Sequence, residues 1–409
     1  GMVVDGMLDA IKRLDATPTP VKFVLQSGDA VVNGRDAKQW NRSFVDLINR
    51  VTSGAGVPYF LAPGNHDVTG SADLASTGRR EGLKNYLDAM AQLIPPDGAS
   101  RRLAGYPTYA FGYGNVFILA IDSNIASDDA QFAWVKAQLD GLDRQRFRHV
   151  IAFFHHPPFS SGPHGGSTVE AAALAVRARY APLFRQHHVR MTITGHEHLY
   201  EHWVERFVDA TGEAQRMDHI VTGGGGAPLY AYQGEPNLQE FTKAGAAEKV
   251  ALEHLVKPGP KPGDNPYHFV IVTVDGDDIQ LDVVGVDWGR DFKPYRSALA
   301  HGVHRRQRAG RGLQVGKLQI RQLSRQHART AGRRQGRARR GVEGRERRVE
   351  RRGPGAARDG SPRCGLRRHH AVDHRARGVD PAHQSPFLGV ERGQIGRARL
   401  AARVVRHGK

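Results

Sequence analysis

Short apolar runs recur along the first 300 residues of the chain, separated by polar or amphipathic stretches. Runs that are rich in Val, Ile, Leu and Phe and bounded by Gly, Asp or Asn are typical of buried strands. We expect strands at residues 21–26, 57–62, 106–113, 116–122, 149–154, 190–194, 201–208, 217–222, 268–274 and 279–286.

Helical periodicity fills several of the intervals. Apolar side chains recur every three or four positions in residues 2–14, as they do in an amphipathic helix. We expect further helices at residues 36–51, in the later part of 70–90, and at 128–142, 170–177 and 181–187, with Ser127 capping the helix at 128–142. Because strands and helices alternate, the pattern indicates an α/β fold.

Charge divides the chain sharply near residue 300. Residues 1–300 contain 29 Lys and Arg against 34 Asp and Glu, whereas residues 301–409 contain 30 against 7. The net charges are therefore −5 and +23. Of the 30 basic residues in the second part 28 are Arg, and sustained apolar periodicity is missing there. Such a segment can scarcely bury a core of its own.

Two explanations of this Arg-rich tail stay open. One is an arm that binds nucleic acid nonspecifically, because guanidinium groups neutralise phosphates and release counterions. The other is out-of-frame translation of a GC-rich gene, since such codons yield Arg, Gly, Ala and Pro. The abrupt change just after Phe292 favours the second explanation. We expect residues 297–409 to be a low-complexity tail that is disordered or out of frame.

Few features bear on compartment or assembly. The single cysteine, Cys364, excludes an internal disulfide framework. No apolar run approaches the roughly 18 residues of a membrane-spanning helix, so we expect no membrane span. Localisation and oligomeric state stay open.

Four short polar motifs each closely follow one of the predicted strands. In open α/β sheets, ligands bind at the carboxyl ends of strands, so we expect these motifs to meet. Their carboxylate, amide and imidazole groups are ligands for divalent metal ions. The motifs are Gly28-Asp29, Gly64-Asn65-His66-Asp67, His155-His156-Pro157-Pro158 and Gly195-His196-Glu197-His198.

The residue types suit a site with two metal ions. Two cations about 3.5–4 Å apart need a ligand that bridges them, and Asp29, just past its strand, is the best-placed carboxylate. Imidazole suits Zn, Fe, Mn or Co, and the neutral amide oxygen of Asn65 leaves the metals Lewis-acidic. Such a pair of metals can activate water and hold phosphate oxygens.

In their order, these motifs resemble those of the calcineurin-like metallophosphoesterase superfamily, and most of all the bacterial relatives of the purple acid phosphatases. The resemblance covers residues 3–296 and implies a four-layer α/β/β/α sandwich of two mixed sheets. It implies metal-dependent hydrolysis of small phosphate esters, in which two divalent or trivalent transition metals (Mn, Fe or Zn) activate a bridging water. Preference for monoesters or diesters stays open.

The resemblance also implies a role for each motif residue. Asp29 would bridge the metals, Asn65, His155 and His196 would hold the second metal, and His198 would hold the first. His66 would be a proton donor or charge stabiliser, with Asp67 orienting its ring. The family pattern favours His155 over His156 as the ligand, which leaves His156 to contact substrate or support its loop. His164, in the Gly-rich loop that follows, is a candidate for substrate contact.

The chain departs from the family pattern in two ways. The family begins with an Asp-x-His or Asp-x-Asn pair that gives the first metal most of its ligands, and nothing here matches it. We therefore expect the metallophosphoesterase domain, residues 1–296, to be N-terminally truncated. A catalytically impaired remnant is thus an alternative to an active enzyme. Val32 stands where true purple acid phosphatases have an iron-binding Tyr, so we expect no tyrosinate–iron centre.

Overall fold

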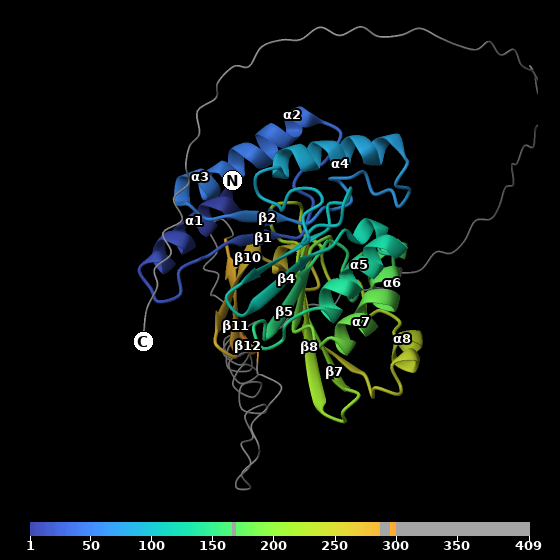
Figure 1. Ribbon diagram of the computed structural model, residues 1–409. Helices are drawn as coiled ribbons and strands as arrows, with labels where there is room; N and C mark the ends of the chain where they lie inside the picture. The colour runs from blue at the N-terminus through green and yellow to red at the C-terminus, as the bar shows by residue number, and fades with distance from the viewer. Residues whose placement is uncertain (166–168, 287–294, 300–409) are drawn as a thin grey trace, which may run out of the picture. The chain divides into compact units, whose positions relative to one another are not determined.

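The computed structural model describes residues 1–165, 169–286 and 295–299, the last of these for the backbone alone (Figure 1). Residues 300–409, which hold nearly all of the predicted Arg-rich tail, lie outside the described residues, so the expectations for that tail are not addressed by the structure.

The larger sheet has seven strands in the order β3-β4-β5-β6-β8-β7-β9. Strands β4, β5, β6 and β8 run parallel to one another, whereas β3, β7 and β9 pair in the antiparallel sense. All residues of β4 and β5 are buried, as expected for parallel strands covered on both faces. The bounds are β3 (Tyr109–Tyr113), β4 (Val116–Ala120), β5 (His149–Phe153), β6 (Met191–Thr194), β7 (Tyr200–Val208), β8 (Ala214–Thr222) and β9 (Ala251–Val256).

The remaining strands form two smaller sheets. A parallel pair consists of β1 (Val24–Gln26) and β2 (Tyr59–Leu61). An antiparallel sheet consists of β10 (His268–Asp275), β11 (Asp278–Gly285) and β12 (Tyr295–Leu299). Among the described residues, no hydrogen-bonded strand joins the two sets, so the second mixed sheet of the prediction is divided into two.

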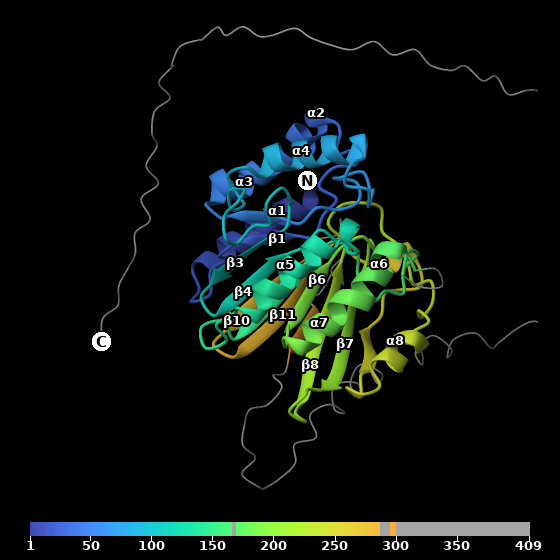
Figure 2. The same ribbon diagram turned by 45° about the vertical axis from the view of Figure 1, so that its right-hand side comes forward.

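Two hydrophobic cores occupy the two faces of the larger sheet, as β4 illustrates. Its side chains alternate: Val116, Ile118 and Ala120 join a core that includes β1, β2, β10 and β11, whereas Phe117 and Leu119 join a core shared with α5 and α7. Figures 1 and 2 show α5, α6 and α7 over one face, and α1, α3 and α4 beyond β1 and β2. The predicted four-layer α/β/β/α arrangement is confirmed.

Two of the helical stretches each contain a π-helical turn. Residues 37–55 run through α2, a turn at Trp40–Val45 and α3, and residues 171–186 run through α6, a turn at Val176–Tyr180 and α7. The bounds are α1 (Met2–Asp15), α2 (Ala37–Gln39), α3 (Asp46–Ala55), α4 (Thr77–Met90), α5 (Asp129–Asp140), α6 (Ala171–Ala175), α7 (Ala181–Gln186) and α8 (Gln239–Ala244), with short 3₁₀ turns at Ser123–Ile125 and Pro262–Asp264.

Several sequence-based boundaries need correction. The helices expected at 170–177 and 181–187 are one continuous stretch. Asp128, not Ser127, caps α5, because its carboxylate accepts the backbone N–H of Gln131 at 2.7 Å. Strand β9 and helix α8 were not predicted. None of the helices among the described residues combines the length and apolar character needed to cross a bilayer.

Candidate metal centre

The four motifs leave the carboxyl ends of four strands. Gly28-Asp29 follows β1, Gly64 begins the motif after β2, His155 follows β5, and Gly195 comes directly after β6. Because β1 and β2 are parallel to each other, as are β5 and β6, each pair delivers its two motifs to one edge. A backbone hydrogen bond of 3.0 Å from Gly195 N to His155 O joins the third motif to the fourth.

Four candidate ligand atoms, one from each motif, converge at the Nε2 atom of His155. This nitrogen lies 2.8 Å from Asn65 Oδ1, 3.2 Å from Asp29 Oδ2 and 3.1 Å from His196 Nδ1. His156 joins His155 and His196 in a group whose ligating atoms all lie within 4.8 Å of one another. Residues separated by up to 167 positions in the chain are thus brought together.

The backbone is unusual at two of these ligands. Asp29 and His196 have φ angles of 54° and 66°, in the left-handed region that non-glycine residues rarely adopt. Such conformations cost about 1–3 kcal/mol each and are concentrated at functional sites. Glycine is also required beside them: a Cβ on Gly28 would lie 2.6 Å from the backbone N of Gly64, and a Cβ on Gly64 would lie 2.1 Å from Asp29 Oδ1.

Electrostatics couple Asp29 to His155. The Nδ1 atom of His155 lies 2.8 Å from the carbonyl oxygen of Ser27, which can only accept, so Nδ1 carries the proton and Nε2 faces the cluster. Burial acts to lower the pKa of His155, but the Asp29 carboxylate outweighs it and the pKa is raised. Burial acts to raise the pKa of Asp29, yet His155 lowers it to about 2. The ionised Asp29 therefore attracts either a proton on His155 or a cation in its place.

His156 is held as a neutral donor. Its backbone N–H donates to Ser123 Oγ at 2.9 Å, and its ring Nδ1 lies 2.9 Å from the same oxygen. Oγ can donate its own hydrogen to Nδ1, and in that arrangement the ring hydrogen lies on Nε2. Burial lowers the pKa of His156 well below its ordinary value. The Nε2–H group is thus available to an acceptor.

His66 is exposed at the rim of the cluster. Its backbone N–H donates to Asp29 Oδ1 at 2.9 Å, which ties the second motif to the first. Its ring Nδ1 lies 2.9 Å from the carbonyl oxygen of Val32. A carbonyl accepts only, so the ring proton is on Nδ1 and Nε2 is free to face a substrate.

Asp67 has a different role from the one expected. It is buried, and its carboxylate accepts the backbone N–H of Gly64 at 2.8 Å and of Val31 at 3.2 Å. The prediction that Asp67 orients the ring of His66 is therefore wrong, because the Val32 carbonyl contacts that ring. Burial, together with the Asp29 charge, raises the pKa of Asp67 to about 7. Asp67 instead fastens the loops that carry the first two motifs.

His164 is brought to the cluster by the fourth motif. Glu197 accepts the backbone N–H of His164 at 2.8 Å, and its other oxygen lies 3.3 Å from the ring Nδ1. The ring centroids of His164 and His196 are 4.5 Å apart. This hydrogen bond to Glu197 raises the pKa of His164. Sequence reasoning assigned no role to Glu197, which is buried and supports the loop of a candidate substrate-contacting residue.

Glu170 belongs to the cluster and was missed by sequence reasoning. Its Oε2 lies 3.0 Å from His196 Nε2, and with His164 and His196 it forms a second group whose ligating atoms lie within 4.8 Å of one another. The residue directly precedes α6 and belongs to no motif. An isolated glutamate before a helix carries no signal that distinguishes it from a solvent-exposed one.

His198 takes part in another set of contacts. Its Nδ1 lies 2.8 Å from the carbonyl oxygen of Pro228, so Nε2 is the nitrogen with a free lone pair. Its ring stacks on Tyr230 with centroids 4.2 Å apart. Burial lowers the pKa of His198, and the Asp29 charge acts in the opposite sense. His198 is thus kept neutral, as a metal ligand must be.

The donor set fits a transition metal. Two imidazole nitrogens, a carboxylate oxygen and an amide oxygen are the ligands of Zn, Mn, Fe and Co sites. Asp29, Asn65, His155 and His196 are all buried or half-buried, so water competes poorly for their lone pairs. The set suits a bound metal ion better than it suits an isolated cluster of acceptors.

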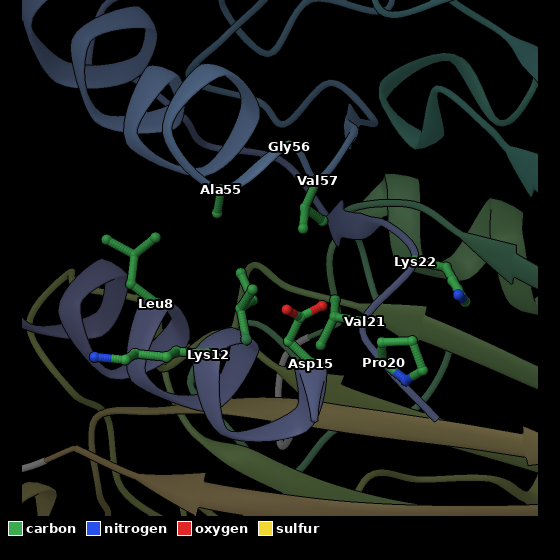
Figure 3. Close-up of a pocket in the computed structure, with 10 residues that line it drawn as sticks. Leu8, Lys12, Asp15, Pro20, Val21, Lys22, Ala55, Gly56 and Val57 are labelled. Carbon is green, nitrogen blue, oxygen red and sulfur yellow. The ribbon is translucent and has the colours of Figure 1, made fainter. Parts of the chain in front are cut away.

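A cavity of about 450 Å³ lies elsewhere in the fold (Figure 3). It is lined by α1, by Ala55 and Gly56 at the C-terminal end of α3, and by Val21 and Val57, which precede β1 and β2. The motifs follow the carboxyl ends of those strands, whereas the cavity lies at their amino ends. None of the candidate ligands lines it, so we assign it no part in the metal centre.

Comparison with known proteins agrees with the motif set. The family model of the calcineurin-like phosphoesterases matches residues 4–200. An uncharacterized protein of Mycobacterium tuberculosis is 25% identical over 269 residues, with 56% of this chain and 48% of that protein covered. The mouse serine/threonine-protein phosphatase CPPED1 is 23% identical over 232 residues, with 54% of this chain and 64% of the relative covered.

The chain spans about half the length of the first of these relatives. Among solved structures, the purple acid phosphatase PPD1 of yellow lupin aligns with a TM-score of 0.49 and 19% identity, covering 72% of this chain and 48% of that one. The match to the family model spans the stretch from Gly28 to His198 and so includes all four motifs. Over residues 4–200, this chain is therefore similar to the calcineurin-like phosphoesterase family.

Proposed function

We propose that this chain hydrolyses small phosphate esters with the help of bound metal ions. The observation that carries the proposal is the convergence of Asn65 Oδ1, Asp29 Oδ2 and His196 Nδ1 on His155 Nε2. Each of the four atoms can offer a lone pair to a cation, and each comes from a different motif. The match of residues 4–200 to the calcineurin-like phosphoesterase family model supports phosphoester hydrolysis as the class of reaction.

Two metal positions are proposed. Asp29, Asn65, His155 and His196 would hold one ion, and Asp29 with His198 would begin a second position. When bound, divalent or trivalent Mn, Fe or Zn ions supply Lewis acidity that polarises a phosphate ester and favours deprotonation of water. The first set has four protein ligands and the second has two, whereas catalytic metals usually keep at least three. We therefore expect the four-ligand position to fill first.

Three histidines would act on the substrate. The Nε2–H group of His156 would donate to a phosphate oxygen while Ser123 Oγ donates to Nδ1. His164, bonded to Glu197, would offer a further donor to the phosphate. The exposed ring of His66 would stabilise charge or, when protonated at both nitrogens, pass the Nε2 proton to the leaving group while the Val32 carbonyl holds Nδ1–H.

The proposed catalytic domain is residues 1–296. A catalytically impaired protein is the second candidate, and the observation that favours it is the short ligand set, Asp29 and His198, at one of the two metal positions. Nonspecific nucleic-acid binding would belong to the tail, which lies outside the described residues. Metal content and turnover of the full chain distinguish an active enzyme from an impaired one.

Adjacent histidines give a matched test of the proposal. Hydrolysis of an aryl phosphate ester and metal content after dialysis would be measured for the full chain with Mn²⁺, and for His155→Ala and His156→Ala. We expect His155→Ala to lose tightly bound metal and activity together. His156→Ala should keep its metal and lose turnover by about 10²–10⁴-fold, the usual contribution of a positioned proton donor. Unchanged metal content and turnover in His155→Ala would overturn the assignment.

A further inference from the structure

Both ring nitrogens of His196 are engaged, and in different directions. Nδ1 lies 3.1 Å from His155 Nε2, within the cluster of candidate metal ligands. Nε2 lies 3.0 Å from the Glu170 carboxylate. A neutral imidazole has one N–H and one lone pair, so whatever fixes the proton on one nitrogen fixes the lone pair on the other.

The position of Glu170 determines which nitrogen of His196 carries the proton. An ionised carboxylate accepts hydrogen bonds and cannot donate them, so the ring proton of His196 must lie on Nε2. The lone pair of Nδ1 then points into the cluster. His155 is arranged in the same way by the Ser27 carbonyl, 2.8 Å from its Nδ1. Two imidazole lone pairs consequently face each other across 3.1 Å, an arrangement that a cation between them stabilises.

The side chain of Glu170 is committed to this contact and not to its own helix. The residue occupies the N-cap position of α6, but its side chain makes no capping hydrogen bond there. Its Oε2 instead lies 3.0 Å from His196 and 4.0 Å from His156 Nε2. The side chain is 40% exposed, whereas that of His196 is 7% exposed, so the carboxylate covers the outer side of a buried ring.

We propose that Glu170 is a positioning residue of the metal centre, which holds His196 as the Nε2–H tautomer and turns its Nδ1 lone pair toward the metal. This inference rests on the proposed function. Carboxylates that accept from the far nitrogen of a ligating histidine fix the ring orientation and raise the basicity of the metal-binding nitrogen, and their loss typically lowers metal affinity by about 10–100-fold.

The competing arrangement makes Glu170 a direct ligand, in a separate site with His164 and His196. The ligating atoms of these three residues lie within 4.8 Å of one another. That site would need the lone pair of His196 on Nε2, which removes Nδ1 from the first set unless the ring loses both protons. His164 also directs its Nδ1 to Glu197 at 3.3 Å. The geometry therefore favours the positioning role.

Metal affinity measured without substrate gives the first test. Equilibrium dialysis of the full chain against Mn²⁺ alone would be compared for wild type, Glu170→Ala and Glu170→Gln. Glu240→Ala is the matched control, because Glu240 is an exposed glutamate in the first turn of the short helix α8. We expect about 10–100-fold weaker binding in Glu170→Ala and less than about tenfold in Glu170→Gln, whose amide oxygen still accepts from Nε2–H.

The tautomer of His196 gives a second readout that does not need metal. Ring ¹⁵N shifts of the metal-free chain, assigned by the signal lost in His196→Ala, should report Nε2–H in wild type and in Glu170→Gln, and a mixture of tautomers in Glu170→Ala. If the wild type binds no Mn²⁺, the proposed function fails and this readout still decides the role of Glu170.

Two results would overturn the inference. One is an unchanged affinity and an unchanged tautomer in Glu170→Ala that is folded by circular dichroism. The other is the loss of one bound Mn²⁺ per chain in Glu170→Gln as well as Glu170→Ala, which would make Glu170 a direct ligand.

Discussion

Histidines and carboxylates are buried together in two regions of this molecule, the candidate metal centre and a network across β7 and β8. In the network, Asp218 lies 2.6 Å from His202 Nε2 and also bonds Arg190, whereas Glu205 lies 2.8 Å from His219 Nε2 and 2.9 Å from Arg185 Nη1. Each carboxylate therefore lies between a histidine and an arginine, and its charge is balanced by a permanent cation.

The candidate metal centre lacks that balance. As far as the described residues show, Asp29 is contacted by the backbone N–H of His66 and by His155, and not by an arginine. His155 Nε2 and His196 Nδ1 lie 3.1 Å apart. The positive charge that this arrangement calls for must come from a proton or from a bound ion.

The difference shows how to separate a buried ion-pair network from a metal site. Buried histidines and carboxylates occur in both, so their presence alone decides nothing. What distinguishes the two regions is whether the acceptor atoms have donors within the protein. The pKa of Asp218 shows this: burial acts to raise it, but the hydrogen bonds of His202 and Arg216, with the arginine charges, hold it well below its usual value.

The largest expected effect comes from removing the charge of Asp29. Asp29→Asn keeps the size of the side chain, the acceptor for His66 N–H and a residue that tolerates the observed φ of 54°. If Asp29 is the shared ligand, the loss in kcat/KM for an aryl phosphate should exceed the roughly 10²–10⁴-fold expected of a proton donor. The urea unfolding midpoint should hardly fall. Full activity in this variant, with exposed Asp46→Asn as control, would remove Asp29 from the centre.

The corresponding change in the network should act on stability instead. Asp218→Asn removes the carboxylate that pairs with buried Arg190 and His202 and with half-buried Arg216. Breaking a buried ion pair from one side costs about 3–5 kcal/mol. Urea unfolding should show a loss of this order, while Mn²⁺ affinity of the folded protein stays as in wild type. A stable Asp218→Asn variant that no longer binds metal would mean that the two regions are not distinct.

Bound metal should stabilise the folded protein only when the candidate metal centre is intact. A ligand that binds the folded state alone adds about 4 kcal/mol at a free concentration 1,000 times its Kd. Mn²⁺ should therefore raise the thermal midpoint of wild type, and EDTA should reverse the rise. Asp218→Asn should respond to Mn²⁺ as wild type does, from a lower starting midpoint. The comparison fails if Mn²⁺ raises the thermal midpoint of Asp29→Asn as much as it raises that of wild type.

Much of the fold could be predicted from local patterns because buried parallel strands are nearly continuous apolar runs. Strands β4 and β5 are of this kind, and both were found. Strand β9 was not predicted, because its residues alternate between exposed and half-buried positions and polar residues such as Glu253 and His254 interrupt the apolar run. Helix α8 has only six residues, too few for a periodic pattern.

The site could be predicted only as far as its motifs reach. Asn65 and His155 lie 90 positions apart, and the motifs predicted that they meet. Hydrogen-bond partners were harder to predict, because they depend on how the loops lie against each other. Asp67 was assigned to its neighbour His66, whereas in the fold it accepts N–H groups from two loops. Glu170 belongs to no motif, and only the tertiary structure brings it to His196.

The smallest expected effect comes from a comparison of two buried carboxyl groups on β7 and β8, those of Glu201 and Asp218. Glu201 is buried like Asp218, but its partners are the neutral donors Ser161 N, at 2.8 Å, and Trp203 Nε1, at 3.3 Å. Burial raises the pKa of Glu201 to about 7 despite these hydrogen bonds. The nearby His254 has a pKa lowered by burial, so it stays neutral at and above neutral pH.

Opposite shifts of these two carboxyl groups predict opposite dependences of stability on pH. The folded chain holds the Glu201 proton more tightly than the unfolded chain does, so this contribution is fully present below about pH 4.5 and is lost as pH rises through about 7. The loss amounts to at most about 3 kcal/mol. The contribution of Asp218 is already complete above its unfolded pKa, so it adds no slope between pH 5 and 8. The free energy of unfolding of wild type, measured in urea, should therefore fall between pH 5 and 8. Glu201→Gln should reduce this fall. Identical slopes in the two proteins would show that Glu201 is ionised throughout, balanced by a cation as Asp218 is.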